Sequence, residues 1–427
     1  MKQTPLAASL WAETAPPPPP LGSLIGPADS DVAIVGGGFT GLSAALHLAE
    51  RGVAVTLLEA GEIGEGASGR NNGQVIPHYI RHAPSDIERL YGPARGGRLN
   101  AMIRDAASFV FDLARRHGID CDAVQKGWFQ PAHRPSRLAR SQRLAREWAE
   151  RGAAVDYLDA GRAREMLGGE GYHGGWVAHA GGHLNPLAFA RGLAAAALCA
   201  GASLHIRTPV SAIEAKGAGW RLKTPAGDVS ARHVLLATNA YGGDLWPGLR
   251  RTILPVRVFQ VATRPLGGNL RGIVLPGDQA MSDTRTNLRY ARYARGGRLV
   301  IGGNLLSWHS AENRAKESRA AMLAELFPPL AGIGFDHYWE GYVGVVPERL
   351  PRLVRLAKGV VAAMGYSGRG VAFATALGPV LADWLTGTPD DALPLPVAAP
   401  RPIPAYPVAR AVARLMPLVN RWQDGRD

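Results

Sequence analysis

The stretch DVAIVGGGFTGLSAALHLAERGVAVTLLEA, residues 31–60, constrains the fold more than any other part of the chain. The apolar run at 31–35 predicts a buried strand, and the apolar spacing after it predicts a helix. Gly36, Gly38 and Gly41 stand between them in the spacing G-x-G-x-x-G. In a strand–turn–helix context this spacing is typical of a turn that brings backbone amides and a helix N-terminus close to a pyrophosphate.

The strand expected after this helix, VAVTLLE, ends in Glu59, 18 residues after Gly41. An acid at about this distance accepts hydrogen bonds from a ribose in dinucleotide-binding βαβ units. We therefore predict that an adenosine-type dinucleotide binds here. NAD and FAD both satisfy the pattern, so the unit by itself does not distinguish them.

Composition indicates a globular protein of two closely packed domains or one large α/β body, because the chain has 427 residues, 46% hydrophobic and 19% charged. Apolar runs are far shorter than the roughly 20 residues of a membrane span. The N-terminus lacks the pattern of a signal peptide, and its proline run predicts a stiff extended lead-in. Cys121 and Cys199, 78 residues apart, form neither a disulfide framework nor a thiolate metal site. We expect a cytoplasmic protein.

The net charge of +13 raises the alternative of a nucleic-acid partner. Arginines are spread along the chain, however, and the local cluster at 134–146 has no aromatic residues interleaved with it. We interpret that cluster as solvated surface and expect no nucleic-acid partner. The pairs His78/His82 and His179/His183 lack nearby carboxylates that would complete a ligand set, so we expect no metal.

Beyond the fingerprint, residues 64–76, GEGASGRNNGQVI, resemble the GASGRNGGQ segment of the glycine/D-amino-acid-oxidase superfamily, and particularly its gamma-glutamylputrescine oxidase branch. Residues 9–24, 181–205, 231–241 and 365–387 also resemble segments of that branch. The resemblance implies FAD rather than NAD.

Between residues 221 and 304, segments in which apolar and polar residues alternate are bounded by glycines, and this pattern predicts an antiparallel sheet. The run VAFATALGPVLADWL predicts a helix after a glycine-rich loop. With the resemblance, these features imply an α/β fold of two domains: a Rossmann-like FAD-binding domain of discontinuous segments and an antiparallel-sheet substrate domain. The expected divisions are 1–28 as a lead-in, 29–85 with 145–245 and 340–390 as the FAD-binding domain, 86–144 with 246–339 as the substrate domain, and 391–427 as a C-terminal tail or helix.

The expected cofactor contacts come from the fingerprint, the segment after it, one return strand and the C-terminal loop. They are Gly36, Gly38, Phe39, Thr40, Gly41, Glu59, Ala60, Ala67, Ser68, Arg70, Asn71, Asn72, Gly73, Gln74, Val210, Thr238, Gly368, Arg369, Gly370 and Val371. Relatives with covalent flavin use a cysteine near the C-terminal motif or a histidine where this chain has Arg70. No cysteine follows Cys199, so we expect noncovalent FAD.

The resemblance also bears on the substrate. Members that act on small amino acids hold the substrate carboxylate with an arginine in a W-x-G-x-R motif. Here the corresponding residues run from Trp339 to Val343, and Val343 stands at the arginine position. This departure argues against a small α-amino acid. We take Tyr342, Tyr290 and Arg292 as candidate pocket residues, with Tyr342 as the strongest.

The reaction implied by the resemblance is oxidation of an amine C–N bond to an imine, by hydride transfer to flavin N5, followed by hydrolysis. The substrate would be a polyamine, a gamma-glutamyl amine or a secondary amine, with O2 as acceptor and H2O2 as product. A lysine that activates oxygen in some relatives corresponds to Val300, so a dehydrogenase that uses a quinone or another acceptor stays open. Alternatives of another class are an RNA-associated flavoprotein and a non-catalytic flavin-binding subunit.

Overall fold

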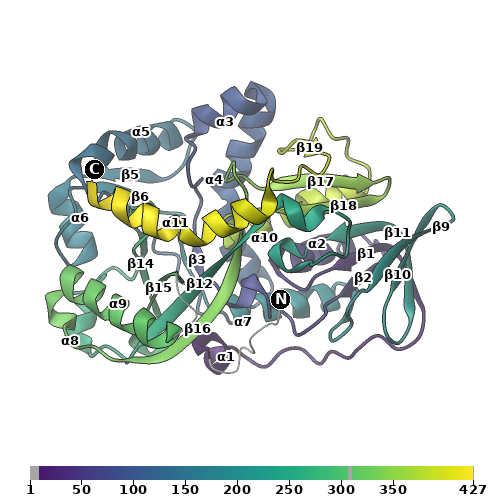
Figure 1. Ribbon diagram of the computed structural model, residues 1–427, viewed down its shortest axis with the longest axis horizontal. Helices are drawn as coiled ribbons and strands as arrows, with labels where there is room; N and C mark the ends of the chain where they lie inside the picture. The colour runs from purple at the N-terminus through teal and green to yellow at the C-terminus, as the bar shows by residue number, and fades with distance from the viewer. Residues whose placement is uncertain (1–8, 306–309, 427) are drawn as a thin grey trace.

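Two large sheets organise the molecule (Figure 1), seen in a computed structural model that describes residues 9–305 and 310–426. The first sheet has nine strands, and its central strands β18, β11, β1, β2 and β8 run parallel. In spatial order it contains β19 (Val397–Ala398), β17 (Arg352–Ala357), β18 (Val360–Met364), β11 (Asp228–Leu236), β1 (Ala28–Val35), β2 (Val55–Leu58) and β8 (Ser203–His205), with β10 (Gly219–Lys223) on β11 and β9 (Ala212–Lys216) on β10. The parallel strands expected around the glycine turn are confirmed.

Helices α2 (Phe39–Ala49), α7 (Pro186–Cys199) and α10 (Gly370–Leu385) accompany this sheet, and α2 packs against both of the others. Every residue of α2 is buried, which explains why its sequence is apolar around most of its circumference. Close packing of α2 on α10 depends on Gly378, because a Cβ there would lie 2.0 Å from Ser43 Oγ. The helices expected from the fingerprint and from the C-terminal apolar run are therefore present.

The second sheet has eight strands and is almost entirely antiparallel, with one parallel pair between β13 and β4. Its spatial order is β16 (Phe335–Val345), β12 (Leu254–Thr263), β15 (Arg298–Asn304), β14 (Tyr290–Ala294), β13 (Ala280–Ser282), β4 (Trp128–Pro131), β6 (Gly175–Ala178) and β5 (Val155–Leu158). A short third sheet joins β3 (Gln74–Val75) to β7 (Gly182–His183). The α/β fold with one parallel and one antiparallel sheet agrees with the expected fold class.

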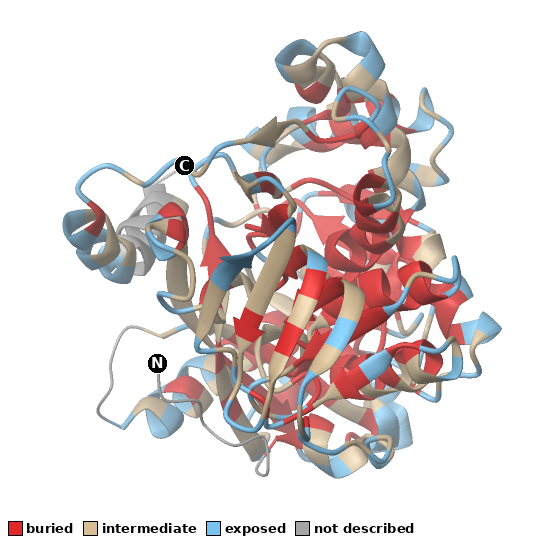
Figure 2. Ribbon diagram, turned by 90° about the vertical axis from the view of Figure 1, so that its right-hand side faces the viewer, coloured by how far each residue is buried: buried red, intermediate tan, exposed pale blue. Residues whose placement is uncertain are grey.

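The remaining helices surround these sheets. They are α1 (Leu10–Thr14), α3 (Pro84–Tyr91), α4 (Pro93–Arg116), α5 (Leu138–Ala149), α6 (Ala160–Leu167), α8 (Gly268–Arg271), α9 (Ala311–Leu326) and α11 (Tyr406–Arg426). Buried residues gather in the sheets and in the helix faces that cover them (Figure 2). No helix in the described ranges is long and apolar enough to cross a lipid bilayer.

Sheet membership differs in places from the expected division of the chain. Strands β5 and β6 join the second sheet although they lie within 145–245, and β16 joins it although it extends past residue 340. Short strands in a chain that crosses repeatedly between two sheets carry no local mark of the sheet they will join. The domain boundaries stay a prediction.

Both terminal segments dock on the body. The described part of the lead-in begins with α1, whose Leu10 and Trp11 are buried, rather than being extended throughout. At the other end α11 packs against β12 and crosses the face seen in Figure 1. Tyr406 Oη donates a hydrogen bond of 3.1 Å to the Ile253 carbonyl, and the Asp424 carboxylate accepts one of 2.8 Å from the Thr286 amide.

Candidate active site

One continuous cavity of about 1460 Å³ has walls from both sheets. It exceeds the roughly 300–1,000 Å³ of common ligand pockets, so it has room for a dinucleotide together with a substrate. The glycine turn, residues 66–74, and the loop before α10 form one part of its wall, and strands β12 and β14 with helix α9 form another. The expected cofactor contacts that line it are Gly36, Gly38, Phe39, Thr40, Glu59, Ala60, Ala67, Ser68, Asn71, Asn72, Gly73, Gln74, Val210, Thr238, Gly368, Arg369, Gly370 and Val371.

The glycine turn has the geometry that a pyrophosphate site requires. Gly36 has φ +114°, a conformation that L side chains rarely adopt, and its amide donates to the Leu58 carbonyl at 2.9 Å. Gly41 does not line the cavity, because it is packed on the turn itself: a Cβ there would lie 2.1 Å from the Gly36 carbonyl oxygen. The N-terminus of α2 therefore opens onto the cavity, with Gly38 at the N-cap and the Phe39 amide donating to Ser68 Oγ at 3.0 Å.

Glu59 lies just beyond the end of β2, beside the glycine turn. Its two carboxylate oxygens accept hydrogen bonds from the Gly37 amide at 2.6 Å and the Gly61 amide at 2.8 Å. Burial raises the pKa of Glu59, and the two amide hydrogen bonds oppose that rise. A carboxylate held in this way retains free lone pairs that can accept hydrogen bonds from ribose hydroxyls, so the wall fits the ADP portion of a dinucleotide.

Residues 70–72 form a wall of the cavity whose backbone is fixed from behind. Their three successive carbonyls each accept a hydrogen bond from a different buried side chain: Trp339 Nε1 at 2.9 Å, Trp11 Nε1 at 2.8 Å and Arg292 Nε at 2.8 Å. These donors come from β16, α1 and β14, which are far apart in the sequence. The segment is thus held in one conformation by tertiary contacts.

Arg292, expected to contact substrate, lies behind this segment and outside the cavity. It also donates to the Leu184 and Tyr293 carbonyls, both at 2.7 Å, and its guanidinium lies 4.3 Å from the Trp11 ring centroid. Burial lowers its pKa to about 9. Its observed contacts are those of a residue that holds the backbone of 70–72.

Tyr290 does line the cavity, and its hydroxyl has a fixed orientation. Gln260 Nε2 donates to Tyr290 Oη at 3.0 Å, and Asn72 Nδ2 donates to Gln260 Oε1 at 3.1 Å. Burial raises the pKa of Tyr290 to about 12, so the phenol is neutral near pH 7. Since its oxygen accepts from Gln260, its proton is available to an acceptor inside the cavity.

Two other predicted residues lie outside the cavity lining. Tyr342 packs edge-on against Tyr241, with ring centroids 6.1 Å apart, and it is Tyr241 and the neighbouring Val343 that line the cavity. Arg70 points its guanidinium at the Glu65 carbonyl, 2.6 Å from Nε. Sequence reasoning missed Tyr241, although it is the last residue of the segment 231–241, which resembles the gamma-glutamylputrescine oxidase branch.

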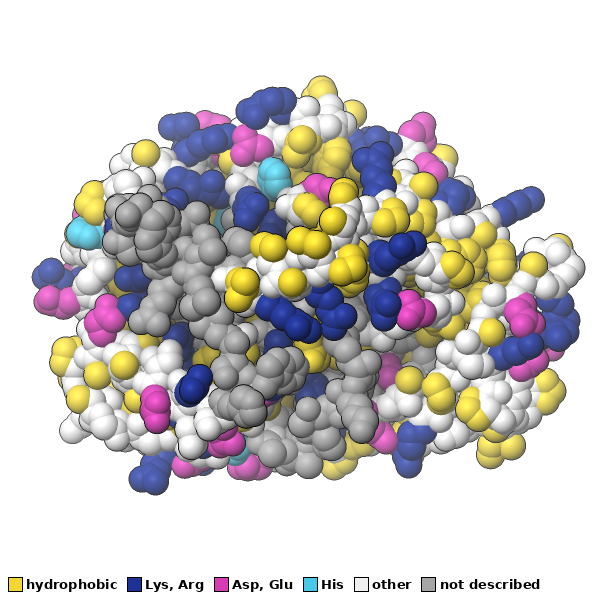
Figure 3. Space-filling view, in the orientation of Figure 1, with side chains coloured by type: hydrophobic (Ala, Val, Ile, Leu, Met, Phe, Trp, Pro, Cys, Tyr) yellow, Lys and Arg dark blue, Asp and Glu magenta, His cyan; other side chains and the backbone are white. Residues whose placement is uncertain are grey.

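Sequence reasoning also missed several arginines of the cavity wall, among them Arg81, Arg140 and Arg349. Arg140 belongs to the basic cluster at 134–146, which we had interpreted as solvated surface. On the face seen in Figure 3, lysine and arginine side chains are scattered and interspersed with acidic ones. Among the described residues, no group of three or more histidine, cysteine, aspartate or glutamate side chains could hold a metal ion.

Comparison with known proteins decides the family. A family model described as FAD dependent oxidoreductase, the DAO family, matches residues 31–384. The chain belongs to the DAO family. It is 33% identical over 430 residues to the probable oxidoreductase OrdL of Rhizobium meliloti, covering 98% of this chain and 97% of that protein. It is 32% identical over 382 residues to gamma-glutamylputrescine oxidoreductase of Escherichia coli, covering 89% of each.

Solved structures of other DAO-like proteins share the fold. Glycine oxidase from Geobacillus kaustophilus aligns with a TM-score of 0.71 at 24% identity, over 85% of this chain and 96% of that one. L-amino acid deaminase from Proteus vulgaris aligns with a TM-score of 0.73 at 16% identity, over 90% of this chain and 97% of that one. The protein is thus an FAD-dependent oxidoreductase, and the resemblance seen in the sequence is confirmed.

Proposed function

We propose that this DAO-family enzyme oxidises the C–N bond of an amine to an imine, which water then hydrolyses, with O2 as electron acceptor and H2O2 as product. The substrate class is a polyamine, a gamma-glutamyl amine or a secondary amine. FAD, when bound, supplies the hydride acceptor. The observation that carries the proposal is the single cavity that joins the dinucleotide fingerprint to the second sheet. A relative named gamma-glutamylputrescine oxidoreductase, similar over 89% of this chain, supports the substrate class.

In this proposal the lining residues named above, other than Arg369, hold FAD, and the second sheet with the segments beside it positions the amine. Tyr290 donates a hydrogen bond to an acceptor atom of the substrate. The same cavity is lined by Val256, Val258 and Val343, which exclude water from the neighbourhood of the amine. Because Val343 offers no cation, a carboxylate directly beside the reacting carbon has no partner at that position. An amine without such a carboxylate therefore fits better.

An anaerobic stopped-flow screen tests the proposal directly. Holoenzyme would be mixed with polyamines, gamma-glutamyl amines, N-methyl amines and D-amino acids, and the loss of oxidised flavin absorbance would be followed. We expect bleaching with one of the first three classes and none with small α-amino acids. If no amine bleaches the flavin, the proposed function is wrong.

A dehydrogenase that delivers electrons to a quinone or another acceptor is the second candidate. Val300 stands where some relatives carry an oxygen-activating lysine, and no lysine is found among the described residues that line the cavity. Peroxide formed per amine consumed, compared with the rate of dye reduction under argon, separates the two candidates. Stoichiometric peroxide identifies an oxidase, whereas dye reduction without peroxide identifies a dehydrogenase.

A further inference from the structure

Four arginines from four separate segments line one region of the cavity. Arg81 precedes α3, Arg140 lies on α5, Arg349 lies between β16 and β17, and Arg369 caps α10. Two of them meet directly, since Arg140 Nη2 donates to the Arg81 backbone carbonyl at 2.7 Å. Burial and then the charge of Arg81 lower the pKa of Arg349.

The buried side chain of His78 lies behind the cavity lining, 5.5 Å from the Trp128 ring that Arg369 also faces. Burial, and then the charges of Arg369 and Arg140, hold the pKa of His78 well below its ordinary value. We call Arg81, Arg140, Arg349 and Arg369 the arginine subsite.

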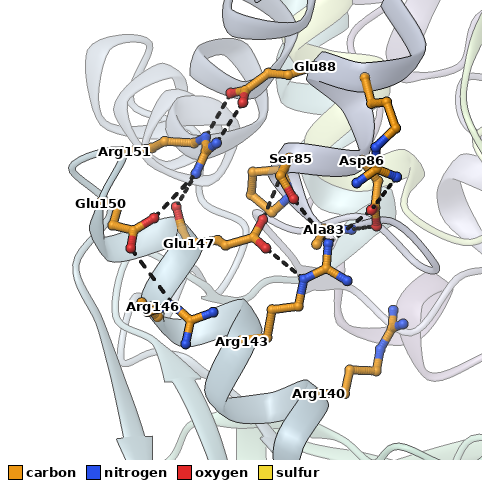
Figure 4. Close-up of polar contacts among 12 residues, drawn as sticks. Ala83, Ser85, Asp86, Glu88, Arg140, Arg143, Arg146, Glu147, Glu150 and Arg151 are labelled. Atoms are coloured by element: carbon orange, nitrogen blue, oxygen red, sulfur yellow. Dashed lines mark hydrogen bonds and ion pairs between the residues drawn. The ribbon is translucent and has the colours of Figure 1, made fainter.

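None of these arginines has a carboxylate partner within the described part of the chain. Figure 4 shows why for Arg140: Asp86, the nearby acid, is already engaged by Arg143 Nη2 at 2.9 Å and by the Ala83 amide at 2.9 Å. Glu147 in turn accepts from Arg143 Nε at 2.6 Å. Figure 4 draws Arg140 without a dashed contact to any of these residues.

Two other acidic residues of the cavity wall are engaged by arginines outside the subsite. Asp283 is paired with Arg285, and the Glu325 carboxylate accepts two hydrogen bonds of 2.8 Å from Arg289. These acids therefore do not neutralise the arginine subsite.

Arg369 gives the strongest indication that a ligand belongs here. Its side chain is 6% exposed, its Nε is buried without a hydrogen-bond partner, and its guanidinium lies 5.6 Å from the Trp128 ring centroid. A buried guanidinium without an anion is costly, and an anion entering the cavity would remove that cost. Arg349 has φ +58°, an uncommon conformation for a residue other than glycine.

We propose that the arginine subsite binds a carboxylate of the substrate, remote from the C–N bond that is oxidised. This inference rests on the proposed function and narrows its substrate class to amines that carry a distant carboxylate. Guanidinium groups pair with carboxylates through two parallel hydrogen bonds, which favours this anion. The second ammonium of a plain diamine would be repelled by the same four cations.

The pyrophosphate of FAD does not account for the subsite, because a separate place for it exists at the glycine turn. There Gly36, Gly38 and the N-terminus of α2 line the cavity beside Ser68, whose Oγ accepts from the Phe39 amide at 3.0 Å. The free cations of the arginine subsite are therefore available to the substrate.

The first test compares three kinds of probe on the holoenzyme. Anaerobic flavin reduction would be measured with ω-amino acids of four to eight carbons, their carboxamides and the matching diamines. We expect the best ω-amino acid to exceed its carboxamide by at least about tenfold in second-order rate constant, since a charge-assisted pair is lost in the amide. Equal rates for all three kinds of probe would overturn the inference while leaving amine oxidation intact.

The second test uses variants and does not depend on turnover. Holoenzyme would be titrated with glutarate, and the visible flavin spectrum and the melting temperature would be followed. We expect saturable binding that is weakened about tenfold in Arg140→Gln and Arg349→Gln, with little response to glutaramide. Arg146→Gln is the matched control, because Arg146 is on the same helix, pairs with Glu150 and lies outside the cavity. Unchanged glutarate binding in both subsite variants contradicts the inference.

Inorganic phosphate and sulfate would be titrated in parallel. We expect both to bind more weakly than glutarate. Tighter binding of phosphate than of glutarate would show a general anion site and overturn the carboxylate assignment. If no amine bleaches the flavin but glutarate binds as described, the proposed function fails and the subsite stands.

Discussion

At the scale of single residues, the structure separates two side chains that alternation along a strand places on the same face. Tyr290 and Arg292 are two residues apart on β14, yet only Tyr290 reaches the cavity. The backbone of residues 70–72 covers Arg292 and accepts its hydrogen bond. The same strand therefore contributes one group that faces the cavity and another that holds the backbone of its wall.

Arg292→Met tests the second of these roles. The change removes one hydrogen-bond donor from each of the Asn72, Leu184 and Tyr293 carbonyls, so we expect it to cost about 3 kcal/mol of folding stability and to weaken FAD binding. Thermal unfolding and a fluorescence titration of apoprotein with FAD measure both effects. Arg232→Met serves as the control, because Arg232 is an exposed partner of Asp31 and such surface pairs contribute little. Unaltered FAD affinity in the Arg292 variant would contradict the assigned role.

Tyr290→Phe tests the first role. Loss of one neutral hydrogen bond to the substrate should lower the rate constant for flavin reduction about tenfold, with FAD binding unchanged. Since the pKa of Tyr290 is raised to about 12, the phenol stays protonated below that pH. The enzyme and the variant should therefore show pH–rate profiles of the same shape up to pH 10. A variant as fast as the parent enzyme would exclude Tyr290 from substrate binding.

At the scale of elements, the junction between β1 and α2 determines whether the nucleotide site can form. Gly41 lets the first turn of α2 rest on the Gly36 carbonyl. This contact aims the helix N-terminus and its unpaired amides at the cavity.

Gly41→Ala should disrupt that junction. A Cβ 2.1 Å from a carbonyl oxygen requires backbone movement, so we expect a cost of about 3 kcal/mol or more, and loss of bound FAD. The ratio of absorbance at 450 nm to that at 280 nm in purified protein reports FAD content. Gly22→Ala is the matched control, because nothing lies within 4 Å of a Cβ at Gly22. Full flavin content in Gly41→Ala would show that the helix can shift without consequence.

At the scale of the whole molecule, the cavity exists only because two sheets meet across it. The residues that line it include some of the first forty in the chain, some of the last sixty described ones and residues of both sheets. A substrate that reaches FAD must therefore contact the second sheet or the segments beside it.

The composition of that wall bears on how FAD is attached. No cysteine or histidine is present among the described residues that line it, and Arg70 points away from it. We expect acid precipitation to leave all flavin in the supernatant. Yellow colour retained in the washed pellet would indicate a covalent bond.

The βαβ unit could be predicted from the sequence alone, and the resemblance to a known family added the cofactor and the fold class. The fingerprint works locally: strand, turn, helix and acid lie within thirty residues, and each is specified by spacing or backbone freedom. The fold was needed to place Arg292 behind the cavity wall, Tyr241 in that wall, and Arg81, Arg140, Arg349 and Arg369 along the same cavity. These residues come from segments distant in the chain, and whether a side chain faces a cavity depends on which neighbours cover it. Local periodicity does not contain that information.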